Sequence, residues 1–261
     1  MQSMQPVPSR ANILGVGVSP INTSLALQVI DGWIERNEHR YICVTGVHGV
    51  IESQRSETLR HIHNAAGLVT PDGMPLVWLS RLQGFPSVDR VYGPDLMLAL
   101  CQHSSVDKGY RHFLYGSKPN VLACLKTNLL KRYPELKIVG VHAPPFHPLS
   151  SEEVDAETQA INDANPDIVW VGLSTPKQEY WMDRNRTRLN AKVLIGVGAA
   201  FDFHAGLKKQ APYWVQRSGL EWLFRMATEP RRLWKRYLFN NPVFLALTFA
   251  QLLGIKKYSL D

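Results

Sequence analysis

Residues 168–173 read IVWVGL, and residues 192–198 read KVLIGVG. Both runs are apolar without the alternation of a half-exposed strand, which is expected when helices cover both faces of a parallel sheet. Further short β-branched runs alternate with helix-length segments and occupy residues 13–18, 41–45, 67–70, 112–115 and 137–141. The pattern therefore predicts an α/β fold in which a Rossmann-like, mostly parallel sheet is flanked by helices and joined by right-handed crossovers.

The pattern becomes purely helical after Gly206. Residues 217–261 carry eight basic and three acidic residues, which is +5 of the net charge of +7, and aromatic residues are interleaved with them. We expect three parts: a flexible N-terminus over residues 1–11, an α/β domain over residues 12–210, and a basic, helical C-terminal appendage over residues 211–261.

Within the appendage, Pro230 suits a first helical turn, and Asn240-Asn241-Pro242 is expected to end that helix. Helical spacing separates a basic face from an apolar face between these points. The basic face carries Arg231, Arg232, Lys235 and Arg236, and the apolar face carries Leu233, Trp234, Tyr237 and Leu238. Such a segment suits an anionic membrane surface, although a helical flap packed on its own core explains it equally well.

Length and composition exclude several classes of protein. The chain has 261 residues, of which 45% are hydrophobic and 20% charged, and this is typical of a globular protein. Its cysteines, Cys43, Cys101 and Cys124, lie far apart in apolar runs and are interpreted as reduced core thiols of a cytoplasmic protein. We expect no secretory signal, and no apolar run approaches the length of about 18 residues that a membrane-spanning helix needs.

Polar residues follow most of the predicted strands at their carboxyl ends, which is where open parallel sheets bind ligands. The loops GSKP and GLSTPKQE each precede a helix, so backbone N–H groups and the helix dipole make a plausible phosphate cradle that includes Gly116 and Gly172. The other residues at strand ends are Thr45, Asp72, Gln178, Glu179 and Asp202.

Each of these side chains has a structural alternative. Asp72, in TPDGMP, is the strongest candidate for proton chemistry, but an aspartate there is also a common helix N-cap. Gln178 and Glu179 fit a first helical turn, and Asp202 fits a cap or a lysine pair. Arg90 fits a surface ion pair as well as an anion clamp.

Other chemistry has little support. The pairs Gly15/Gly17 and Gly196/Gly198 lack the third glycine of a dinucleotide fingerprint, and there is neither a P-loop nor a facing histidine pair. There is also no D-x-D pair to hold a divalent cation on a diphosphate. We therefore expect no metal and no cofactor, with arginines and backbone groups neutralising any bound phosphate.

Five motifs, in order, resemble the WecG/TagA/CpsF family of glycosyltransferases: VTPDGMPLVW, RVYGPDLM, VGLSTPKQEYWM, GVGAAFDFHAG and APYWVQRSGLEWLFRMATEPRRLWKRY. The resemblance runs from about Asn12 to Leu238. It implies a metal-independent, inverting enzyme that transfers a hexose, such as N-acetylmannosamine, from a UDP-sugar to an undecaprenyl-diphosphate-linked sugar. The expected location is the inner face of the cell membrane, in cell-wall or exopolysaccharide synthesis.

The resemblance also assigns roles to residues. It makes Asp72 the catalytic base and places Thr45 and Arg90 in the same pocket, with substrate contacts from Gln178, Asp202, Arg225, Arg231 and Arg232. Gly116 and Gly172 are added as substrate contacts because they begin the two strand-end loops. The three arginines would close over the donor diphosphate. Where the family often reads T-x-N, this chain has Thr45-Gly46-Val47-His48, so the resemblance suggests His48 in place of the asparagine.

Two other functions stay open at this point. The basic, aromatic C-terminal region would also suit a nucleic-acid-binding protein, but that function gives the polar strand ends no task. A nicotinamide-dependent oxidoreductase would suit the Rossmann-like sheet. Because the expected function is that of an enzyme acting on a lipid-linked substrate, no nucleic-acid partner is expected, and a homo-oligomer is left open.

Overall fold

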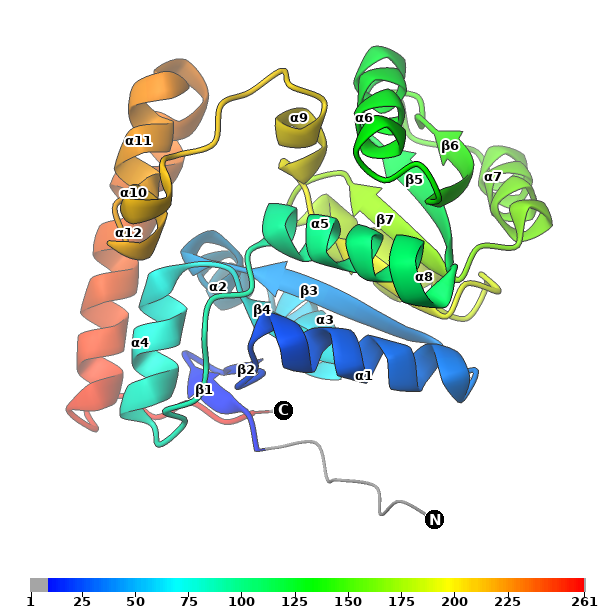
Figure 1. The fold of residues 1–261 in the computed structure, drawn as a ribbon. Helices are drawn as coiled ribbons and strands as arrows, with labels where there is room; N and C mark the ends of the chain where they lie inside the picture. The colour runs from blue at the N-terminus through cyan, green and yellow to red at the C-terminus, as the bar shows by residue number, and fades with distance from the viewer. Residues whose placement is uncertain (1–8, 261) are drawn as a thin grey trace. The chain divides into compact units, whose positions relative to one another are not determined.

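The computed structural model describes residues 9–260 (Figure 1). These residues form two compact units. Unit 1 contains the described residues up to Asn22, residues 45–92 and residues 211–260, and unit 2 contains residues 23–44 and 93–210. Of the predicted flexible N-terminus, residues 1–8 lie outside the described residues, and β1 begins at Ala11.

Unit 2 confirms the predicted fold class. Its parallel strands lie in the order β3 (Arg40–Thr45), β8 (Val193–Gly196), β7 (Ile168–Gly172), β5 (Arg111–Gly116) and β6 (Lys137–His142). The helices that flank them are α1 (Thr23–Glu35), α5 (Gly93–His103), α6 (Pro119–Arg132), α7 (Ser151–Ala164), α8 (Lys177–Asn185) and α9 (Ala200–His204), with a π-helical turn at Ser104–Lys108. The central strands β7 and β8 are buried along nearly their whole length, as their unbroken apolar sequences predict.

Unit 1 joins the start, middle and end of the chain. It contains β2 (Val16–Val18), β4 (Leu68–Pro71), α2 (Val47–Arg55), α3 (Glu57–Ala65), α4 (Met74–Leu82), α10 (Tyr213–Arg217), α11 (Glu221–Thr228) and α12 (Pro230–Leu252). The single strand predicted over residues 13–18 is wrong: β1 (Ala11–Ile13) and β2 form an antiparallel hairpin. Leu14 and Gly15 turn the chain, both with positive φ, which glycine adopts easily.

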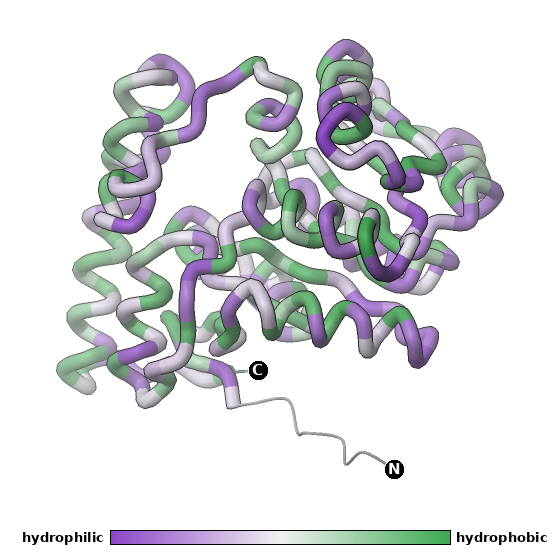
Figure 2. Tube along the Cα trace, viewed as in Figure 1, coloured by the Kyte–Doolittle hydropathy of each residue, from purple (hydrophilic) through white to green (hydrophobic). Residues whose placement is uncertain are grey.

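The helix stop predicted at Pro242 is also wrong, because α12 continues through this proline to Leu252. Packing explains the difference. Phe244 and Thr248 are buried beyond the proline and hold the second, mostly hydrophobic half of the helix in place (Figure 2). Burial of these two side chains outweighs the one backbone hydrogen bond that a proline removes.

The predicted apolar face of this helix is split. Leu233 is buried as expected, whereas Trp234 and Leu238 are exposed by 43% and 61%.

One of the three cysteine predictions is wrong as well, since Cys43 and Cys101 are buried but Cys124 is exposed on α6. Across residues 9–260, no helix combines the length and the apolar character that a membrane span requires.

The core of unit 2 contains an acid-sensitive group, His112. The ring is fully buried and its Nδ1 accepts a hydrogen bond of 2.9 Å from the indole N–H of Trp170. Burial lowers the pKa of His112 from its ordinary value of 6.5 to about 3. The folded state therefore favours the neutral ring, so this contribution to stability is present above pH 6.5 and is lost as the pH falls towards 3.

We predict that His112→Asn flattens the dependence of unfolding free energy on pH in this range. Asparagine still accepts from Trp170 but does not titrate, and the removed slope is about 1.4 kcal/mol per pH unit at most. Urea unfolding at several pH values between 7 and 4 measures it. The exposed His61→Asn change is the matched control and should leave the slope unchanged; equal slopes in all three proteins would contradict the prediction.

Candidate active site

In unit 1, the end of β4 carries Asp72 beside the loop that follows Thr45. The Asp72 N–H donates to the Thr45 carbonyl at 3.0 Å, and a Cβ added at Gly46 would lie 3.7 Å from Asp72 Oδ2. Helix α4 begins at Met74, and its N-cap is Gly73, with no side-chain cap. Asp72 is therefore not the N-cap residue of α4, which corrects the helix-cap alternative, and its side chain is partly exposed.

Arg90 is a buried hub and not the surface ion pair that the sequence allows. Its Nε donates to the Asp72 carbonyl, one terminal nitrogen donates to Gln216 Oε1 at 2.9 Å, and the other pairs with the Glu221 carboxylate. The guanidinium also lies 4.0 Å above the centre of the Tyr92 ring. One side chain thus connects the strand end that carries Asp72 with α10 and α11.

The charges around Arg90 act on one another. Burial raises the pKa of Glu221; Asp72 adds to this rise, whereas Arg90 and Arg225 oppose it. Burial also raises the pKa of Tyr92, and Glu221 and Asp72 contribute to that rise. Burial by itself would lower the pKa of Arg225, but the nearby tyrosines, Glu221 and Asp72 outweigh burial and raise it. Arg225 is therefore a charged neighbour of Asp72.

The other two candidate arginines lie outside this cluster of polar side chains. Arg231 and Arg232 are exposed at the start of α12, and Arg232 pairs with Glu229 at 2.6 Å. The first arginine of the basic region, Arg217, is used in a partly exposed pair with Asp89 at 2.8 Å.

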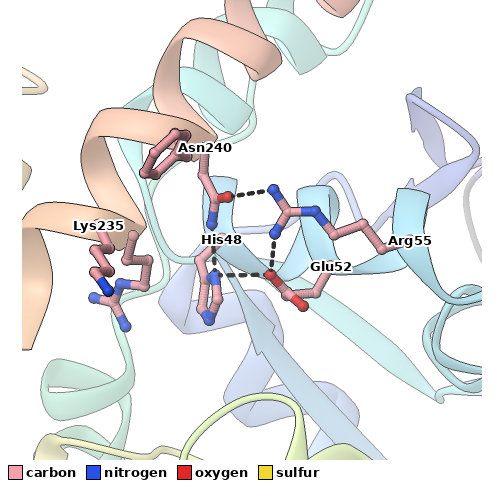
Figure 3. A pocket seen from close by; sticks show the side chains of 7 residues that line it. His48, Glu52, Arg55, Lys235 and Asn240 are labelled. Carbon is pink, nitrogen blue, oxygen red and sulfur yellow. Dashed lines mark hydrogen bonds and ion pairs between the residues drawn. The ribbon is translucent and has the colours of Figure 1, made fainter.

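His48 lies in the first turn of α2 and contacts Asn240 of α12, with Asn240 Nδ2 at 3.0 Å from His48 Nδ1 (Figure 3). The sequence suggested His48 as a substrate contact, but it treated Asn240 only as part of a helix stop. Gln216, Glu221 and Tyr92 were missed too. The available signal was Glu221 itself, one of only two acidic residues in the predominantly apolar and basic motif of residues 211–237.

In unit 2, Gly116 and Gly172 are register neighbours at the carboxyl ends of β5 and β7. Gly116 has a φ of +113°, and a Cβ there would lie 2.8 Å from the Gly172 carbonyl carbon. A Cβ at Gly172 would lie 2.5 Å from the ring of Phe201. Close packing against the neighbouring backbone at Gly116 and against the Phe201 ring at Gly172 therefore favours glycine at both positions, independently of any ligand.

Gln178 and Glu179 lie in the first turn of α8, as the structural alternative predicts, and both are buried. Glu179 Oε1 accepts from Thr175 Oγ1 at 2.8 Å and from Gln178 Nε2 at 3.1 Å. Within the described part of the chain, Gln178 Oε1 and Glu179 Oε2 are buried without a hydrogen-bond partner.

Asp202 pairs with Lys208 at 2.7 Å, which confirms the lysine alternative. Residues 9–260 contain no group of three or more histidine, cysteine or acidic side chains arranged to hold a metal ion.

An α/β fold with polar side chains at the ends of its parallel strands is typical of ligand-binding enzymes. Residues 11–258 match the model of the glycosyl transferase WecG/TagA/CpsF family, and the chain belongs to this family. It is a glycosyltransferase, as the motifs predict, and this membership favours neither nucleic-acid binding nor nicotinamide chemistry.

Curated relatives carry the name N-acetylglucosaminyldiphosphoundecaprenol N-acetyl-beta-D-mannosaminyltransferase. The relative from Bacillus spizizenii is 28% identical over 83% of this chain and 81% of its own length. That from Bacillus subtilis is 33% identical over 67% of this chain and 66% of its own length. A relative from Staphylococcus aureus is 29% identical over 70% of this chain and 68% of its own length.

We predict that Arg90→Ala destabilises the protein far more than Arg217→Ala. The first change leaves the buried Glu221 carboxylate without its cation, which typically costs about 3–5 kcal/mol. The second breaks a partly exposed pair worth less than about 1 kcal/mol. Urea unfolding at neutral pH compares the two variants. Similar losses of unfolding free energy would show that Arg90 is not the hub of unit 1.

Proposed function

We propose that this protein is an inverting, metal-independent glycosyltransferase that moves a hexose, N-acetylmannosamine or a related sugar, from a UDP-sugar to an undecaprenyl-diphosphate-linked sugar. The names of the relatives support the transferred sugar and the lipid-linked acceptor. The observation that carries the proposal is Asp72: a partly exposed carboxylate at a strand end, one residue before the N-cap of α4 and close to the Arg225 cation. The product belongs to cell-wall or exopolysaccharide synthesis.

In the proposed reaction, Asp72 removes the proton from an acceptor hydroxyl as its oxygen attacks the anomeric carbon of the donor. An alcohol is a weak nucleophile, and a positioned carboxylate makes it reactive. The new bond joins the acceptor oxygen to the anomeric carbon while the bond from that carbon to the UDP oxygen breaks. A single displacement of this kind inverts the anomeric centre.

Arg90 is proposed to position the base. By holding the Asp72 carbonyl it fixes the backbone from which the carboxylate projects, and Thr45 borders the same strand end. The charge of Asp72 contributes to the raised pKa of Arg225, so the two side chains are close. We propose that Arg225 stabilises the negative charge on the departing UDP, and that Arg231 and Arg232 assist it. In unit 2, Gln178, Asp202, Gly116 and Gly172 are proposed to contact the donor.

The same proposal places the enzyme on the inner face of the cell membrane, where a polyprenyl acceptor resides. Helix α12 exposes basic residues in its first half and large apolar side chains from Leu238 to Leu252, and helices that lie in the membrane interface combine the same two kinds of side chain. The exposed apolar side chains include Leu238, Phe239, Leu245, Phe249 and Leu252. Electrostatic attraction of the basic residues to anionic lipids would add to the apolar contact.

We predict that Asp72→Asn lowers turnover by about 10²- to 10⁴-fold, the usual effect of losing a general base. Asparagine keeps the size and hydrogen-bonding capacity of the side chain, so folding and UDP binding should stay close to normal. Transfer assays with a lipid-diphosphate-sugar acceptor, together with calorimetric titration of UDP, measure both properties. An asparagine variant with near-normal turnover would show that the base is another residue.

Transfer is also predicted to continue in excess EDTA. The sequence has no D-x-D pair, and we propose that cations such as Arg225 neutralise the diphosphate in place of a metal. Initial rates with and without EDTA, and with added magnesium or manganese, provide the measurement. A reproducible requirement for either metal would overturn this account of leaving-group stabilisation.

A further inference from the structure

A pocket of about 350 Å³ opens in unit 1 between α2 and α12 (Figure 3). Its size is within the range of small-molecule sites. It is lined by residues from both helices: His48, Glu52, Arg55, Lys235, Arg236, Phe239 and Asn240. Three of these side chains are permanently cationic and one is acidic, so the pocket is positive overall.

One end of the pocket is fixed by Asn240, which is buried. Its Oδ1 accepts from an Arg55 terminal nitrogen at 2.9 Å, and Arg55 also pairs with Glu52 at 2.6 Å. Because arginine only donates, the amide oxygen must face Arg55, and the amide nitrogen must face His48. Asn240 thus donates to His48 Nδ1, which makes Nε2 the protonated ring nitrogen and a hydrogen-bond donor.

Within residues 9–260, neither Lys235 nor Arg236 forms an ion pair with a carboxylate. Lys235 is exposed, and its Nζ lies 5.5 Å from the centre of the Trp234 ring. Arg236 donates to the Tyr237 hydroxyl at 3.0 Å, and its buried Nε has no hydrogen-bond partner within residues 9–260. A pocket with cations and N–H donors of this kind favours an anion with several oxygens, such as a phosphate ester.

The position of the pocket narrows the choice of anion. Helix α2 begins after Gly46, which lies against the Asp72 carboxylate, and His48 is in the first turn of that helix. On the other side, Lys235, Phe239 and Val243 follow one another at intervals of four along α12, and the latter two are exposed by 60% and 42%. The cationic pocket therefore lies between the candidate base and an exposed apolar strip.

We propose that this pocket binds the diphosphate of the lipid-linked acceptor. The inference rests on the proposed function. A polyprenyl-diphosphate sugar presents a hydroxyl, a diphosphate and an apolar chain in that order, which matches Asp72, the cationic pocket and the apolar strip. The reaction involves two diphosphates, and the cations fall into two groups, since Arg225, Arg231 and Arg232 are not among the residues that line the pocket.

The decisive experiment compares Lys235→Ala with Lys257→Ala, which removes the same charge from an exposed position outside the pocket. Steady-state assays vary the donor and the lipid acceptor separately. Lys235→Ala should raise the acceptor KM about tenfold, the value of one charge-assisted hydrogen bond, and leave the donor KM unchanged. Lys235→Arg should restore the acceptor KM, and Lys257→Ala should behave as the unaltered protein.

Vesicle binding supplies a readout that does not depend on turnover. Vesicles of phosphatidylcholine alone, with added polyprenyl diphosphate, or with added phosphatidylglycerol, separate the diphosphate from ordinary anionic headgroups. Lys235→Ala should lose most of the affinity gained from polyprenyl diphosphate and should match Lys257→Ala on phosphatidylglycerol.

Three results would overturn the inference: a raised donor KM with an unchanged acceptor KM, equal losses on both kinds of anionic vesicle, or no difference between the alanine variants. Failure of the proposed function has a different signature. In that case the unaltered protein transfers no sugar from any UDP-sugar, while the binding of polyprenyl diphosphate to the pocket is still measured by the vesicles.

Discussion

The ion pair between Arg90 and Glu221 is the constraint on which unit 1 depends. Both side chains are largely buried, and neither charge is tolerable there without the other. The two residues are 131 positions apart in the chain. Since the same guanidinium also holds the Asp72 carbonyl, the backbone beside the proposed base and the start of the C-terminal region must take their final positions together.

The basic C-terminal region is part of the folded unit 1 and is not only a charged surface. By composition it is a charged addition to an α/β domain, and its net charge of +5 suggests a surface for anions. In the structure, part of that charge is used internally: Arg217 pairs with Asp89, Arg232 with Glu229, and Arg225 lies among Tyr92, Glu221 and Asp72. Lys235 has no such carboxylate partner in the described structure, and it lines the α2–α12 pocket together with Arg55 and Arg236.

The sequence predicts the sheet well because the information is local. Runs such as IVWVGL can satisfy their apolar side chains only in a strand covered on both faces, so β7 and β8 appear where expected. Asp72 was found by its position after a strand, and the order of motifs indicated the family. The mistakes concern residues whose state is set by distant partners. The sequence around Arg90 does not predict its pairing with Glu221, and the sequence around Pro242 does not predict that Phe244 and Thr248 are buried.

In helix α12, the hydrogen bonds of one buried polar residue, Asn240, determine which side chains are buried and which are exposed. Leu233, Asn240, Phe244 and Thr248 are its buried residues, and at about 100° per residue they fall within a stripe roughly 80° wide. Asn240 is bonded to both His48 and Arg55, so turning the helix by one residue would remove both bonds and bury a different set of side chains. The bonds of Asn240 therefore fix the rotation at which Lys235 lines the pocket and Phe239 and Val243 stay exposed beside it. Asn240, which the sequence predicts to be part of a helix stop, therefore specifies the rotation of α12 about its axis.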